Sequence, residues 1–401
     1  MCLSFSHKTF CHTFGMSVHL SFHILRKINK MIQYDCVTKE NDCKEKREKT
    51  MRKHYLDNIR WFVIILVILN HTVSTFSSCK AMMSYNADGI AALDAIGYFI
   101  YPWFMPCLFL IAGMSAKYAL EKRTEKEFLK ERRNKLLLPF LTYWVILGSI
   151  TAEFSFRINH SYETFEKLPG FVVRLIWLVN GIGPAWFLLQ LFLISLVFLL
   201  VLKLDKNKKL LKLGEKCNVL ILLLFYVPLI LAAQVLYVAY TYRNCFYLLL
   251  FLLGYFVFSH EKIQEMLKKY ALVFLAAALI VGALQTYFCW GEAYQLVVNR
   301  PLVVLYTWLM TLAVLGCFHR FFSGSGKISS YLSKNSFGIY LFHYLPLTVT
   351  AYYVTTGLDL PVILNYILTF VASFGGALVL TEIVKRIPIL NTLFGLSCKR
   401  D

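Results

Sequence analysis

The sequence predicts an all-α, polytopic membrane protein with about ten transmembrane helices and both termini in the cytoplasm. Of its 401 residues, 58% are hydrophobic and only 16% are charged. An ordinary soluble domain is about 45–50% apolar and about 25% charged, so the composition excludes that class. Long apolar runs also recur along the chain between short hydrophilic segments, which is typical of proteins that cross a bilayer repeatedly.

The apolar runs are predicted as membrane spans in the order in which they occur. They cover about 59–78, 93–118, 136–154, 185–203, 219–239, 245–259, 271–290, 301–321, 335–355 and 362–384. The run at 245–259 is the weakest prediction, because a helix normally needs about 20 apolar residues to span a bilayer. Between the third and fourth spans, residues 171–179 are predicted to form a short helix at the membrane interface.

The basic residues set the predicted orientation. The net charge of +19 does not indicate a nucleic-acid partner, because Lys and Arg collect in the short segments between apolar runs. Cytoplasmic segments of membrane proteins carry the excess of such residues. With a cytoplasmic N-terminus, only six of the 42 fall in outer loops, namely Lys80, Arg157, Lys167, Arg174, Arg243 and Arg300.

Three segments are predicted along the chain. Residues 1–54 form a basic cytoplasmic tail that is expected to be dispensable, because Met51 offers a later start beside the first span. Residues 55–385 form the transmembrane domain, and residues 386–401 form a short cytoplasmic tail. The eleven cysteines have no CxxC spacing, so no metal site is expected.

The first span contains two residues that membrane insertion does not require. Arg60 and His71 are eleven positions apart and therefore lie close to one face of a helix. A rise of 1.5 Å per residue separates them by about 16 Å along the axis. An ionisable residue inside a span is a functional candidate by default. The alternatives are a hydrogen bond between packed helices for His71 and a snorkelling topology anchor for Arg60.

Five stretches carry a resemblance to a known family. They are Arg60 with His71, preceded by Tyr55–Asp57; Met105–Met114; Phe128–Pro139 with Arg132, Arg133 and Lys135; Gly183–Leu188 with Trp186; and Ser336–His343 with Tyr340. In this order they resemble the membrane acyltransferase-3 family, over residues 55–385. Ala112 replaces the serine that is usual in the family's second helix, and Lys135 replaces the usual second arginine before the proline.

The resemblance implies an integral membrane O-acyltransferase. Such a protein would move an acyl group, expected to be acetyl, from cytoplasmic acyl-CoA to a hydroxyl of a carbohydrate, glycolipid or other exported acceptor at the plasma membrane. His71 would be the general base, since imidazole titrates near neutrality. His343 would assist in catalysis or bond another helix. Arg60, Arg132, Arg133 and Lys135 would hold the CoA end of the donor, although Arg132, Arg133 and Lys135 also fit an ordinary positive-inside loop.

Two other function classes remain open on the sequence alone. A transporter or flippase of a small or lipid-linked solute would also have aromatic and intramembrane polar residues. A catalytically silent sensor or scaffold with the same fold is the third possibility. Turnover of acyl-CoA distinguishes the enzyme from both.

Overall fold

The computed structural model describes residues 53–81, 89–165, 167–237 and 242–396. Within these ranges every regular element is a helix, which confirms the predicted all-α class. The predicted tail at 1–54 lies almost wholly outside the described residues. The domain boundaries and the cytoplasmic location of both termini therefore stay predictions.

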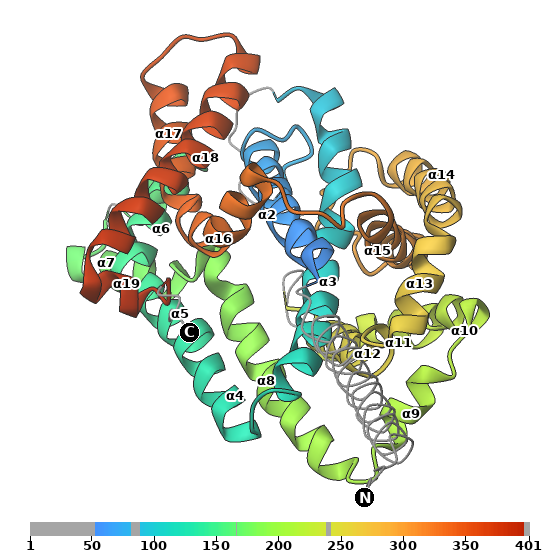
Figure 1. Cartoon of the computed structure of the whole chain (residues 1–401). Coiled ribbons are helices and arrows are strands. Elements are labelled where there is room, and N and C mark those ends of the chain that lie inside the picture. Colours follow the sequence, from blue (N-terminus) through green and yellow to red (C-terminus); the bar gives the residue numbers. More distant parts are fainter. Residues whose placement is uncertain (1–52, 82–88, 166, 238–241, 397–401) are drawn as a thin grey trace, which may run out of the picture. The chain divides into compact units, whose positions relative to one another are not determined.

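Helix α2 (His54–Thr75) lies at the centre of the membrane unit (Figure 1). It packs against α3 (Ala91–Leu120), α15 (Pro301–Phe321), α16 (Lys327–Phe342) and α18 (Val362–Arg386). Neighbours on several sides explain why its apolar residues are not confined to one stripe, since a helix that is hydrophobic all round is an interior helix. Arg60 and His71 on this central helix are both partly buried.

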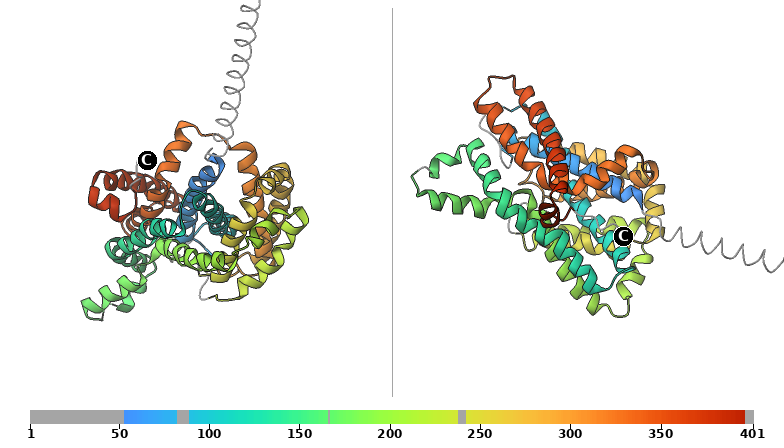
Figure 2. Two further views of the ribbon diagram at one scale, coloured as in Figure 1. Left: turned by 60° about the horizontal axis from the view of Figure 1, so that its bottom comes forward. Right: turned by 60° about the vertical axis from the view of Figure 1, so that its left-hand side comes forward.

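A long helical rod replaces two elements that the sequence predicts as separate. It runs continuously through α4 (Glu125–Arg132), the π-helix η1 (Arg133–Leu137), α5 (Leu138–Tyr143), the π-helix η2 (Trp144–Gly148) and α6 (Ser149–Ile158). The sequence predicts a charged surface helix within 117–135 and a separate span at 136–154. Pro139 cannot donate to the helical ladder, and the π-segment directly before it shifts the bonding without ending the helix. Helix α8 (Trp186–Leu204) runs beside this rod (Figure 2).

The predicted number of about ten membrane-spanning helices stays a prediction. Seven helices of the described residues are long and apolar enough to cross a membrane, or nine if each of two sharply bent pairs is one span. The remaining bounds are α7 (Gly170–Asn180), α9 (Lys209–Glu215), α10 (Val219–Leu224), α11 (Tyr226–Gln234), α12 (Asn244–Leu253) with η5 (Gly254–Phe258), α13 (Glu261–Lys269), α14 (Ala271–Cys289) and α19 (Pro388–Leu393). Helix α7 confirms the short helix predicted at 171–179.

The span predicted at 335–355 is wrong as a single helix. Helix α16 ends at Phe342 and α17 (Tyr344–Thr356) begins after His343. Pro346 supplies the physical reason, because its ring would collide with the carbonyl group of Phe342 in an unbroken helix. The interruption places His343 at a helix junction.

Two glycines allow α3 to approach α12 and η5 closely. A Cβ added to Gly113 would lie 2.0 Å from the carbonyl oxygen of Phe251, and one added to Gly254 would lie 2.0 Å from that of Leu110. No side chain larger than hydrogen fits at either position without moving backbone. This close contact fixes the position of α12 beside α3.

Candidate active site

The first of two cavities along α2, called here the Arg60 cavity, has a volume of about 280 Å³. Its polar lining consists of Arg60, Ser115, Arg132, Ser336 and Tyr340, and the rest of its wall is largely apolar. The cavity thus offers two guanidinium groups at the edge of an apolar channel. That combination suits a ligand with anionic groups at one end and an extended, weakly polar arm.

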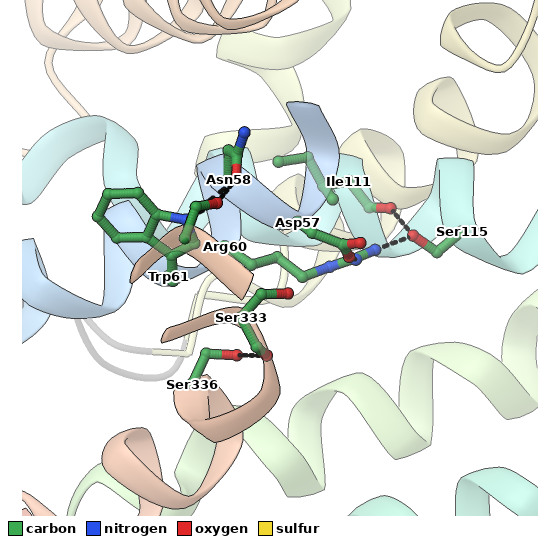
Figure 3. Close-up of polar contacts among 9 residues, drawn as sticks. Asp57, Asn58, Arg60, Trp61, Ile111, Ser115, Ser333 and Ser336 are labelled. Atoms are coloured by element: carbon green, nitrogen blue, oxygen red, sulfur yellow. Dashed lines mark hydrogen bonds and ion pairs between the residues drawn. The ribbon is translucent and has the colours of Figure 1, made fainter. Parts of the chain in front are cut away.

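Arg60 is held in place from two helices (Figure 3). Its guanidinium donates to the carboxylate of Asp57, one turn earlier on α2, and to Oγ of Ser115 on α3. Ser115 in turn donates to the carbonyl oxygen of Ile111 at 2.7 Å. Asp57 and Arg60 are three positions apart on one helix, a spacing at which oppositely charged side chains meet. Because the Arg60 side chain remains one-third exposed, its contacts leave part of the guanidinium facing the cavity.

Of the three basic residues around position 133, the structure brings one to the cavity. Arg132 lines it, with its guanidinium carbon 4.7 Å from the centre of the Phe128 ring. Arg133 donates instead to the side chain of Asn134 at 3.2 Å. Lys135 is 54% exposed and pairs with Glu131 at 2.7 Å. Arg60 and Arg132 are thus the two guanidinium groups that line this cavity, whereas Arg133 and Lys135 are not among its lining residues.

The second cavity, called here the His71 cavity, has a volume of about 40 Å³. His71, Asn70, Arg243 and Tyr247 supply polar groups to its lining, together with Tyr340. Tyr340 also lines the Arg60 cavity, so its ring is a wall shared by the two spaces. Its hydroxyl donates to the carbonyl oxygen of Pro184, which fixes the ring from a third segment.

The two predicted catalytic histidines meet. The ring centroids of His71 and His343 are 5.5 Å apart, and His71 is also 5.3 Å from the ring of Tyr344. His343 is fully buried, and the carbonyl oxygen of Tyr340 accepts from its Nδ1 at 2.7 Å, so the proton is assigned to Nδ1. Only His71 lines the cavity. Among the described residues, no hydrogen bond engages either ring nitrogen of His71, which leaves them available to a ligand.

Sequence reasoning missed three residues of this site. Arg243 was counted as an outer-loop charge, although only 2% of it is exposed. The sequence points to Tyr340 only as part of the stretch Ser336–His343, and nothing in the motifs points to Asn70. The neighbourhood of Asn70 and His71 in one apolar run was a usable signal, because an amide inside a span is costly without partners.

Comparison with known proteins places the whole membrane portion of the chain in one family. A family model described as an acyltransferase domain matches residues 53–382. The glucans biosynthesis protein C of Escherichia coli (strain K12) is 24% identical, over 86% of this chain and 94% of the relative. The protein of the same name from Salmonella heidelberg (strain SL476) is 23% identical with the same coverage. No solved structure matches the chain.

Proposed function

Because this chain belongs to the acyltransferase-3 family and is a membrane acyltransferase, we propose that it transfers an acyl group from acyl-CoA to a carbohydrate hydroxyl. The acyl group is expected to be acetyl. The carbohydrate acceptor is suggested by relatives named glucans biosynthesis protein C. We place the protein in the plasma membrane, with the donor entering at the Arg60 end of α2 from the cytoplasm.

One observation carries this proposal. A single helix directs a cation into one cavity and an imidazole into a second, and Tyr340 is the wall between them. The Arg60 cavity would take the phosphates and the pantetheine arm of the donor, since guanidinium groups bind phosphate oxygens through paired hydrogen bonds. The thioester would then pass the ring of Tyr340 and enter the His71 cavity. The Arg60 cavity matches the phosphate end of the donor, and His71 supplies a base at its thioester end. These two matches favour acyl transfer over solute transport.

The reaction follows from these positions. His71 takes the proton of the acceptor hydroxyl while that oxygen attacks the thioester carbonyl carbon. The tetrahedral intermediate then collapses, the carbon–sulfur bond breaks, and the departing thiolate takes the proton from the His71 imidazolium. The products are an ester and CoA. His343 acts on His71 by packing against its ring and does not itself line the cavity.

The test is transfer by purified protein in detergent, with labelled acetyl-CoA and a β-glucan oligosaccharide. Wild type should release CoA and label the sugar, whereas His71→Ala should lose about 10²–10⁴-fold in turnover, as expected for removal of a general base. His160→Ala is the matched control, because His160 is an exposed histidine in a turn, 3.4 Å from the carboxylate of Glu163. Normal turnover by His71→Ala would remove the proposed base, and uptake of solute without CoA release would favour the transporter.

A further inference from the structure

Arg243, the residue before α12, is a buried cation in the His71 cavity. Only 2% of the residue is exposed, and it lines the same 40 Å³ space as His71. One amino group donates to the carbonyl oxygen of Val298 at 3.2 Å, and the guanidinium carbon lies 3.9 Å from the centre of the Phe246 ring. Its Nε has no hydrogen-bond partner. Within the described ranges no carboxylate pairs with it.

Such a charge is unusual inside a protein. A buried ion costs free energy unless an opposite charge or a full set of hydrogen bonds compensates for the lost water. A carbonyl group, an aromatic face and the neighbouring hydroxyl of Tyr247 supply only part of that compensation, because Nε remains without a partner. The other arginine that lines a cavity, Arg132, is only partly buried and has Glu131 beside it in the chain. The guanidinium of Arg243 can therefore still donate a hydrogen bond to a negatively charged oxygen.

Asn70 provides a second, independent observation. It is completely buried, and neither its amide nitrogen nor its amide oxygen has a partner. It precedes His71 on α2 and lines the same cavity. An unpaired amide donor, an unpaired guanidinium donor and a candidate base thus surround one small space. That space has room for a group the size of a carbonyl and not for a sugar ring.

We propose that Arg243 and Asn70 form an oxyanion site for the acyl carbonyl group, which rests on the proposed acyl transfer. When the acceptor oxygen bonds to the thioester carbon, the electron pair of the C=O double bond moves onto the carbonyl oxygen. That oxygen accepts from Arg243 and from the Asn70 amide, while the acceptor proton resides on His71. When the double bond re-forms, the carbon–sulfur bond breaks and the thiolate takes that proton. Preorganised donors at a developing charge are a large source of rate enhancement.

The test uses a neutral acyl group and a neutral acceptor, acetyl-CoA and an uncharged β-glucan oligosaccharide. Arg243→Gln should lower turnover about 10²–10³-fold, the range known for loss of one oxyanion donor, with donor affinity changed less than twofold. Arg243→Lys should retain part of the rate because it keeps the charge without the guanidinium geometry. The control is Arg300→Gln, since Arg300 is an exposed arginine that pairs with Glu292, and its turnover should stay within twofold.

Three outcomes would overturn the inference. If Arg243 binds a permanent negative charge of the natural substrate, Arg243→Gln would turn over this uncharged pair as fast as wild type. If Arg243 only stabilises the fold, the loss of turnover in Arg243→Gln would equal the loss of folded protein measured by thermal unfolding. If Arg243→Gln does not fold, Asn70→Ala tests the same site, and full turnover by that variant would refute it. A wild type that never releases CoA would instead refute the proposed function.

Discussion

Arg60 and His71 are expected to act on different steps, donor binding and proton transfer. The distance between them along α2 predicts whether the effects of substituting each residue add. Both residues lie on one unbroken helix, eleven positions apart, and a rise of 1.5 Å per residue gives a separation of about 16 Å. Substitutions more than about 7–10 Å apart usually add within roughly 0.3–0.5 kcal/mol. The two residues also line different cavities. A double-mutant cycle should therefore show near-additivity.

The expected values follow from the contacts. Arg60→Gln removes a charged donor whose hydrogen bond to a phosphate is worth about 1.5–3 kcal/mol, so acetyl-CoA should bind about 10- to 150-fold more weakly. Turnover at saturating donor should stay close to wild type. His71→Ala should do the reverse, lowering turnover without changing donor affinity. Calorimetry in detergent measures the affinity, and CoA release measures the turnover.

Arg320→Gln is the control for lost positive charge, because Arg320 is an exposed arginine near the end of α15. Its donor affinity should match wild type. Thermal unfolding of each variant shows whether Asp57, which loses its partner in Arg60→Gln, destabilises the fold. A coupling energy above about 1 kcal/mol between Arg60 and His71 would contradict independent action at two sites. Unchanged donor affinity in Arg60→Gln would return this residue to the role of a topology anchor.

Two further substitutions test the framework of the site. Gly113→Ala should lower the thermal unfolding midpoint, because the new methyl group would overlap a backbone carbonyl oxygen of α12. Gly375→Ala is the control and should leave the midpoint unchanged, because Gly375 has open space around it. Equal midpoints for the two variants would argue against the close helix contact. His343→Ala should leave donor affinity unchanged and lower turnover less than His71→Ala does, because His343 packs against the His71 ring without lining the cavity. A loss of turnover as large as that of His71→Ala would make His343 a second proton carrier.

Much of the site could be predicted from local pattern. The spacing of Arg60 and His71 on one helix, and the pairing of Asp57 with Arg60, depend only on helix periodicity. The break at His343 was also encoded, because Pro346 lies three residues later and cannot continue a helix through Phe342.

What the sequence could not reveal is which charges are buried. Arg243 and Arg300 both lie in predicted outer segments, and composition gives them the same role. In the folded chain one is enclosed in a cavity and the other is paired at the surface. The difference arises from tertiary packing of α12 against the loop that carries Val298. Likewise, Arg132 and Arg133 are neighbours in the chain, and only Arg132 lines the cavity. Which of the two does so depends on how the helical rod packs in the folded protein.

Tyr340 offers a final test, because its ring is the wall between the two cavities. Tyr340→Ala should join them and admit water to His71 along the donor channel, so acetyl-CoA hydrolysis without acceptor should rise relative to transfer. Tyr340→Phe keeps the ring and loses only the hydrogen bond to Pro184, which is worth about 0.5–1.5 kcal/mol, and its hydrolysis should stay low. CoA release with and without a β-glucan oligosaccharide measures both reactions, below the unfolding midpoint of each variant. If both variants hydrolyse equally, the hydroxyl contact and not the ring separates the two spaces.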